Sequence, residues 1–157
     1  MKYKKVPLTQ DEFATLMKQF NLETFTGLRD CTYLMLLRLI ISDKLTSSLS
    51  VYDILAQEMK LEGSMSHLLI PKDTFNLLKK YLNERSHKNP SIDALFITKS
   101  GRILPHIYFR VAFPRYVRRA GIRPGERCSL GFLSYSALLQ QSRVYNFLLS
   151  IYSNRKN

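Results

Sequence analysis

Acidic residues are almost absent from the second part of this sequence. From Ala94 to Asn157 a single acid, Glu126, stands against 11 Lys and Arg, a net charge of +10. From Met1 to Asp93, 13 Lys and Arg face 11 acids, a net charge of only +2. Self-repulsion among like charges opposes folding, so this segregation indicates a polyanionic partner, with DNA or RNA as the first candidates.

Several signatures of chemistry are also missing. The sequence has no GxGxxG loop, no P-loop and no nucleophile elbow. Its histidines, His67, His87 and His106, lack the spacing of metal ligands, so no zinc site and no other cofactor is expected. Cys31 and Cys128 lie 97 positions apart without a CxxC motif, which is typical of reduced thiols in an intracellular protein.

Long hydrophobic runs are absent as well. The longest, Tyr33 to Ile41, is interrupted by Arg38 and is far too short to span a bilayer. No apolar stretch follows the basic N-terminus, so neither a signal peptide nor a membrane partner is expected. The chain has 157 residues, 45% of them hydrophobic and 23% charged, which predicts a single domain with a real core over residues 1–157.

Hydrophobic periodicity predicts a mainly helical chain. A capping box, Thr9-Gln10-Asp11-Glu12, opens a helix that runs to about Phe20, and Thr26 can cap a nearly all-apolar helix that runs to about Ile41. Further helices are predicted over residues 45–55, 72–88, 106–120, 133–141 and 144–152. Residues 59–70 predict a β-hairpin and residues 95–97 a short strand, so the expected class is mainly α with a small β-hairpin (α+β).

The helix over residues 106–120 carries the most information. One stripe of it is apolar, formed by Phe109, Phe113, Tyr116, Val117 and Ala120. Three arginines, Arg115, Arg118 and Arg119, fall on nearly the opposite face. Gly121 is typical of the residue that follows a helix, and Pro114 is expected to kink the helix or to split it in two.

Four segments, in this order and spacing, resemble the catalytic domain of tyrosine recombinases, the family of phage integrases. They are Leu8-Thr9-Gln10-Asp11-Glu12, Thr26-Gly27-Leu28-Arg29-Asp30, Leu95-Phe96 with Gly101-Arg102-Ile103-Leu104, and Arg118-Arg119-Ala120-Gly121-Ile122. The resemblance extends from Leu8 to Asn154. It implies a recombinase-like fold whose partner is double-stranded DNA.

The positions that cut DNA in that family are changed here. By the resemblance, the two arginines, the hairpin lysine and the two histidine-type positions fall on Lys44, Gly131, Ser66, Cys128 and Asn154. The position of the nucleophilic tyrosine falls beyond Asn157. Because the chemistry needs cations on the phosphate oxygens, the resemblance implies a protein that is not an enzyme.

With the catalytic positions changed, the resemblance still implies a DNA-binding surface. The expected contacts are Lys44, Arg102, His106, Arg110, Arg115, Arg118, Arg119 and Arg123. The natural role is that of a transcriptional repressor, or of a factor that competes for sites on a phage or mobile element, in the cytoplasm at the nucleoid. The family also grips DNA with an N-terminal helical domain. We therefore expect either a C-terminal domain of a longer protein or half a clamp, with residues 1–7 as a basic arm or linker.

Other functions stay open at this point. The chain could be an active strand-transfer enzyme that uses Tyr145 or Tyr152, although a tyrosine with a pKa of about 10 has no means of activation without the arginines. It could also be an RNA-binding or protein-interaction module. Self-association, a regulatory protein partner and the DNA sequence recognised are likewise undetermined by the sequence.

Overall fold

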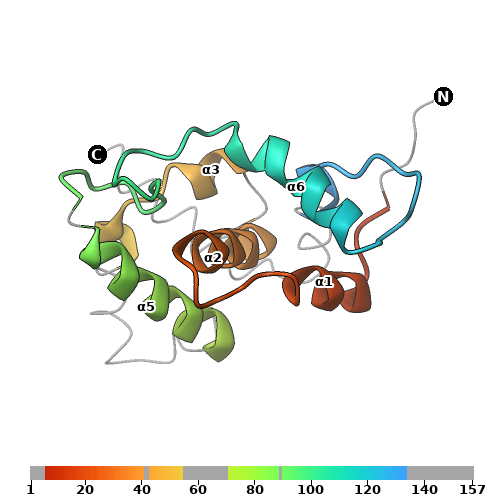
Figure 1. Ribbon diagram of the computed structural model, residues 1–157, viewed down its shortest axis with the longest axis horizontal. Coiled ribbons are helices and arrows are strands. Elements are labelled where there is room, and N and C mark those ends of the chain that lie inside the picture. The colour runs from red at the N-terminus through yellow and green to blue at the C-terminus, as the bar shows by residue number, and fades with distance from the viewer. Residues whose placement is uncertain (1–5, 41–42, 55–70, 89, 134–157) are drawn as a thin grey trace.

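The computed structural model describes residues 6–40, 43–54, 71–88 and 90–133, and these residues are mainly helical (Figure 1). Their named helices are α1 Gln10–Met17, α2 Phe25–Ile40, α3 Asp43–Ser47, α5 Lys72–His87 and α6 Tyr108–Arg119. The pairing of extended backbone in these ranges consists of two isolated antiparallel bridges, Ser50 with Ala94 and Ile97 with Ile103. The mainly helical class is confirmed, while the predicted hairpin over residues 59–70 lies outside the described residues.

Helix α2 lies at the centre, with α1, α3, α5 and α6 arranged around it (Figure 1). Residues 28–34 of α2 are all buried. The nearly all-apolar pattern predicts this for the apolar members, while the polar Arg29, Asp30 and Thr32 are buried as well. Tyr33 shows how the layers meet, because its ring stacks on Phe109 of α6 at 3.5 Å between centroids and meets Phe96 edge-on at 4.9 Å. One apolar core therefore joins α2 to α6 and to the segment between α5 and α6.

The first two helices begin at side-chain caps. Thr9 Oγ1 accepts from Glu12 N at 3.1 Å, and Thr9 N donates to Glu12 Oε2 at 2.8 Å, so the predicted capping box is confirmed. At α2 the cap is Thr24 rather than Thr26, since Thr24 Oγ1 accepts from Gly27 N at 3.1 Å. Helix α1 ends at Met17, three residues earlier than predicted, because the next turn tightens into i−3 hydrogen bonds.

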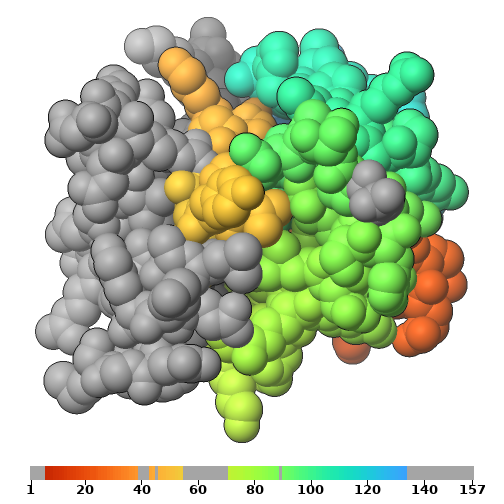
Figure 2. Space-filling model, turned by 90° about the vertical axis from the view of Figure 1, so that its left-hand side faces the viewer, coloured from red at the N-terminus to blue at the C-terminus, as the bar shows by residue number. Residues whose placement is uncertain are grey.

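The helix predicted over residues 45–55 is two helical segments. Helix α3 ends at Ser47, and a new helical turn begins at Val51, with Ser50 N donating to Asp53 Oδ2 at 2.7 Å. The break exists because the backbone between them bonds elsewhere: Leu95 N donates to the Leu49 carbonyl at 2.8 Å. Figure 2 shows this side of the molecule, where residues 43–54 pack beside α5 and the segment that follows it. The strand predicted over residues 95–97 is thus a set of short bridges.

Helix α5 forms as predicted and holds the next segment in place. Arg85 is buried and donates to the carbonyls of Ile92, Ala94 and Leu95 at 2.6 to 3.2 Å. Such a fork of donors satisfies carbonyls that a helix or sheet would otherwise satisfy. The backbone of residues 92–95 is therefore fixed against α5.

The C-terminal part of the described chain begins another helix. Residues 130–133 are helical, so this helix starts at Leu130, earlier than the predicted start at residue 133. The rest of it, the predicted helix over residues 144–152 and residues 1–5 of the predicted arm or linker over residues 1–7 lie outside the described residues. Within the ranges that are described, no helix combines the length and the apolar character needed to cross a bilayer.

Candidate nucleic-acid interface

Helix α6 is amphipathic in the way its sequence predicts. Phe109, Ala112, Phe113 and Val117 are buried, whereas Arg115, Arg118 and Arg119 are exposed. The helix ends in a Schellman motif: Gly121 has φ +68°, its N–H donates to the Arg118 carbonyl, and Ile122 N donates to the Val117 carbonyl. Pro114 lies inside the helix, so of the two expected effects, a kink or a split, the split does not occur.

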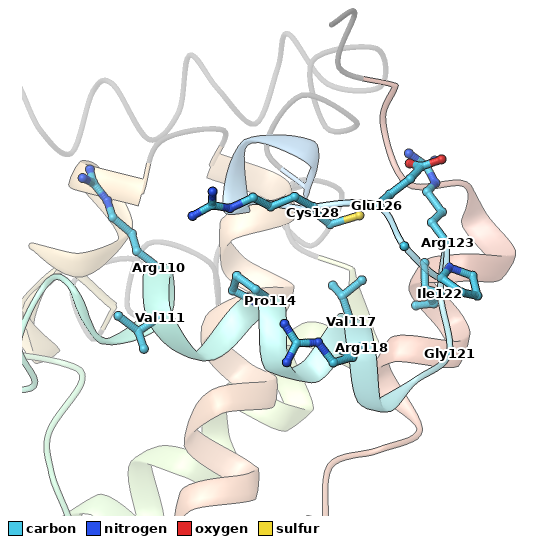
Figure 3. A pocket seen from close by; sticks show the side chains of 13 residues that line it. Arg110, Val111, Pro114, Val117, Arg118, Gly121, Ile122, Arg123, Glu126 and Cys128 are labelled. Carbon is cyan, nitrogen blue, oxygen red and sulfur yellow. The ribbon is translucent and has the colours of Figure 1, made fainter.

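A groove of about 780 Å³ lies between α6 and the loop that follows it (Figure 3). Its walls carry Arg110, Arg118 and Arg127. Opposite charge in the wall comes from Glu126. The arginine side chains of this groove give it the character of a site for an anion.

A second, smaller hollow of about 280 Å³ lies on the other flank of α6. It is lined by Tyr108, Val111, Ala112, Arg115, Tyr116 and Arg119. Arg115 and Arg119 stand one helical turn apart on this flank, so their charges project side by side. Among the described residues, no acid pairs with Arg115, Arg118 or Arg119.

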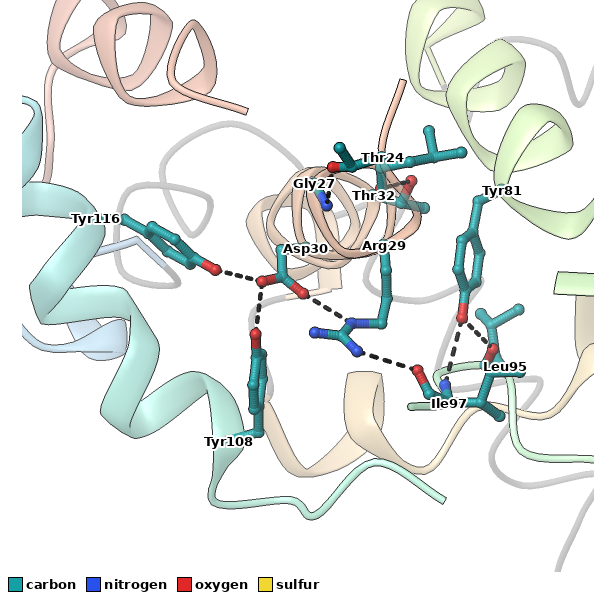
Figure 4. Close-up of polar contacts among 11 residues, drawn as sticks. Thr24, Gly27, Arg29, Asp30, Thr32, Tyr81, Leu95, Ile97, Tyr108 and Tyr116 are labelled. Carbon is teal, nitrogen blue, oxygen red and sulfur yellow. Dashed lines mark hydrogen bonds and ion pairs between the residues drawn. The ribbon is translucent and has the colours of Figure 1, made fainter. Parts of the chain in front are cut away.

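Beneath this face, a buried carboxylate fixes α6 on α2 (Figure 4). Asp30 is fully buried and accepts from Arg29 Nε at 2.8 Å, from the Tyr108 hydroxyl at 2.8 Å and from the Tyr116 hydroxyl. Arg29 also donates to the carbonyl of Ile97 at 3.2 Å and lies over the Tyr108 ring. Because Tyr108 and Tyr116 are eight residues apart on α6, this cluster sets both the position and the rotation of the helix. The helix that carries the exposed arginines is therefore anchored to α2 through Asp30.

Burial and the neighbouring Asp30 carboxylate raise the pKa of Tyr116 and of Tyr108 above the ordinary value of a tyrosine. The Cys128 thiol is buried, and its burial raises its pKa too. These groups stay protonated at neutral pH. Among the described residues, no three His, Cys, Asp or Glu side chains come together in a way that could hold a metal ion.

The predicted contact residues divide into three groups: those on α6, those exposed elsewhere, and Arg123, which is described in the next paragraph. Arg110, Arg115, Arg118 and Arg119 come together on α6, and Arg110 Nε also pairs with Asp43 Oδ2 at 3.2 Å. Lys44, Arg102 and His106 are exposed but line neither hollow.

Arg123 requires a correction. Its guanidinium binds Glu12 through two hydrogen bonds of 2.9 Å and donates to the carbonyls of Val6 and Pro7 at 2.7 and 2.8 Å. The donors of Arg123 are thus directed into the protein, and we remove it from the predicted DNA contacts. Arg127, in the loop after α6, lines the groove but was not among the predicted contacts. No local sequence pattern indicates where its side chain lies.

Two more residues of this surface went unrecognised in the sequence. Ile107 and Val111 are 55% and 48% exposed, although both are large and apolar. The helical spacing that places Arg118 opposite the apolar stripe places these two there as well, so the signal was available.

No protein-family model, curated protein or solved structure matches this chain.

Proposed function

We propose that this chain is a non-catalytic DNA-binding protein with a fold like that of tyrosine recombinase catalytic domains. Its role would be to repress transcription, or to compete for DNA sites, on a phage or mobile element. The observation that carries the proposal is the exposed face of α6. Arg115, Arg118 and Arg119 project from it without acidic partners among the described residues, while the opposite face is buried in the core.

A face of this kind is suited to the phosphate backbone. Each phosphate that an arginine neutralises releases condensed counterions, which makes binding favourable and salt-dependent. The guanidinium is planar and always charged, and its paired donors match either two phosphate oxygens or the edge of a guanine. An ordinary solvated surface usually mixes charges of both signs, and α6 contains no acidic residue.

Two observations support the absence of catalysis. The changed position at Cys128 is a buried, protonated thiol, which cannot reach a phosphate as an exposed histidine would. The tyrosines on α6 donate to Asp30, and their raised pKa values leave no phenolate for attack on phosphorus.

The test is a titration of the purified chain against a labelled DNA duplex at several salt concentrations. We expect the logarithm of the binding constant to fall linearly with the logarithm of the salt concentration. Competition by RNA of the same sequence should be weaker than competition by DNA. If RNA competes better, the chain is an RNA-binding module; if no salt-dependent binding to either occurs, the proposal fails.

A second assay addresses the alternative of an active recombinase. Incubated with supercoiled plasmid, the wild-type chain should neither nick nor relax it. Relaxed or nicked product that disappears on substitution of Tyr145 or Tyr152 would establish strand transfer instead.

A further inference from the structure

The exposed face of α6 is not uniformly basic. At about 100° per residue, Ile107, Val111 and Arg118 fall within roughly 40° of one another and form one line along the helix. The first half of this line is apolar: Ile107 is 55% exposed and Val111 is 48% exposed. The second half is the arginine end. Ile107, at the N-cap of α6, and Val111, within it, thus expose β-branched side chains in line with an arginine, and water is a poor partner for such side chains.

Val111 stands on a ridge between two hollows. It lines both the groove of about 780 Å³ and the smaller hollow of about 280 Å³. Arg110 flanks it on the side of the groove, where it also pairs with Asp43, and Arg115 and Arg119 flank it in the smaller hollow.

This arrangement matches the cross-section of the DNA major groove. The major groove is about 12 Å wide, admits one α-helix and is bordered on each side by a phosphate backbone. A helix inserted there needs cations on its two flanks and base-reading side chains along its ridge. Apolar side chains on the ridge can contact the C5-methyl group of thymine, the one apolar group that base pairs present in the major groove.

We propose that Ile107 and Val111 are specificity-determining residues that contact thymine methyl groups in the major groove. The proposal rests on the DNA-binding function proposed above and adds sequence recognition to it. At about 1.5 Å of rise per residue, the line from Ile107 to Arg118 is roughly 16 Å long, or about five base steps of 3.4 Å. Ile107 and Val111, which are about 6 Å apart along the axis, then lie over base pairs roughly two steps apart at one end. Arg118 lies over the other end, where it can bond to guanine. The preferred site should have thymines followed within a few base pairs by a guanine.

The experiment begins with selection of duplexes by the wild-type chain from a random-sequence pool. The selected duplex is then made a second time with 2′-deoxyuridine in place of thymidine, which removes only the methyl groups. We expect wild-type protein to bind the uracil duplex about tenfold more weakly, the effect of withdrawing two methyl groups from apolar contact. Equal affinity for the two duplexes would overturn the proposal.

A variant then assigns the contact to α6. The double variant Ile107→Ser, Val111→Ser should bind the thymine duplex about as weakly as wild type binds the uracil duplex, and should no longer distinguish the two. The matched control is Tyr52→Ser, which removes an apolar side chain that is 63% exposed in a different helical segment. It should keep the full preference for thymine. A double variant that also keeps this preference would contradict the assignment.

The two proposals fail in different ways. If the selection returns no preferred sequence while salt-dependent binding persists, α6 binds DNA only through its charges, and the inference about Ile107 and Val111 is wrong. If the chain binds no duplex at all, the proposed function itself is lost.

Discussion

Arg123 and Glu12 are 111 positions apart in the sequence and form a two-point ion pair, Nε to Oε1 and Nη2 to Oε2, each at 2.9 Å. The pair ties the start of α1 to the loop after α6. Arg123 adopts a left-handed backbone conformation with φ +46°, which is unusual for any residue other than glycine. The contacts of its side chain with Glu12, Val6 and Pro7 hold it there.

This pair should make the stability of the fold depend on acid pH. The bond from Arg123 holds the pKa of Glu12 below its ordinary value of 4.5. A carboxyl with a depressed pKa stabilises the folded state above the pKa of the unfolded chain, and this contribution is lost as the pH falls through the folded pKa. Glu12→Gln should therefore lower the free energy of unfolding by about 1–2 kcal/mol at pH 7.

Urea unfolding at pH 7 and at pH 3 measures the effect, and the difference between wild type and Glu12→Gln should shrink at the lower pH. The control is Glu23→Gln, which removes the same charge from the exposed pair with Lys80, at 3.3 Å. Exposed pairs contribute about 0–1 kcal/mol, so this control should change little. A Glu12→Gln deficit that stays constant with pH would contradict the linkage.

The hydrogen bonds that Asp30 accepts from Arg29, Tyr108 and Tyr116 should contribute strongly to the packing of α6 on α2. Removal of one hydroxyl by Tyr108→Phe or Tyr116→Phe should cost about 1 kcal/mol each. Asp30→Asn should cost more, about 3–5 kcal/mol, because it leaves the buried guanidinium of Arg29 without its countercharge. Thermal or urea unfolding checks the order of these effects. Tyr52→Phe, which alters an exposed hydroxyl, should stay within about 0.5 kcal/mol of wild type.

Gly27 is required by the cap of α2. A Cβ atom at this position would lie 2.1 Å from the carbonyl oxygen of Asn21 and 2.8 Å from Thr24 Oγ1. Although alanine is normally better than glycine in a helix, Gly27→Ala should here destabilise the protein by about 1–3 kcal/mol, because the capping turn must open. Asn76→Ala on the exposed side of α5 is the control and should be neutral or slightly stabilising. A Gly27→Ala variant more stable than wild type would contradict this prediction, because it would show that the capping turn opens without cost.

These contacts explain which parts of the structure the sequence could predict. The helices α1, α2, α5 and α6 follow from local periodicity, and the Thr9 cap and the Gly121 end follow from local motifs. The break at Leu49 does not, because it depends on a backbone bond to Leu95, and the internal role of Arg123 depends on Glu12.

The same limit applies to the candidate interface. Periodicity gave the direction of Arg115, Arg118 and Arg119, which the structure confirms as exposed. It also placed Tyr116 on the buried stripe, but it could not give the hydroxyl its partner, Asp30, which is 86 positions away. Interactions over such separations are set by the packing of whole helices, and no pattern within one helix records them.

The arginines of α6 give the most direct prediction about function. The triple variant Arg115→Gln, Arg118→Gln, Arg119→Gln should weaken binding to duplex DNA and should flatten its salt dependence. If each arginine neutralises one phosphate, the slope of log K against log salt should fall by about 0.9 per contact, or roughly 2.7 in all. If Arg118 bonds to a base instead, the slope should fall by about 1.8, with the remaining loss of affinity independent of salt.

The matched control carries the same loss of three charges on another helix. Lys72, Lys79 and Lys80 are exposed on α5, and their joint replacement by glutamine changes the net charge equally. If binding depended only on the total charge of the chain, the two variants would lose equal affinity and equal slope. We expect the α5 variant to keep nearly the wild-type slope, because charges farther than about 10 Å from the phosphates are largely screened at 0.1 M salt. Equal behaviour of the two variants, or an unchanged slope in the α6 variant, would show that α6 is not the face that meets DNA.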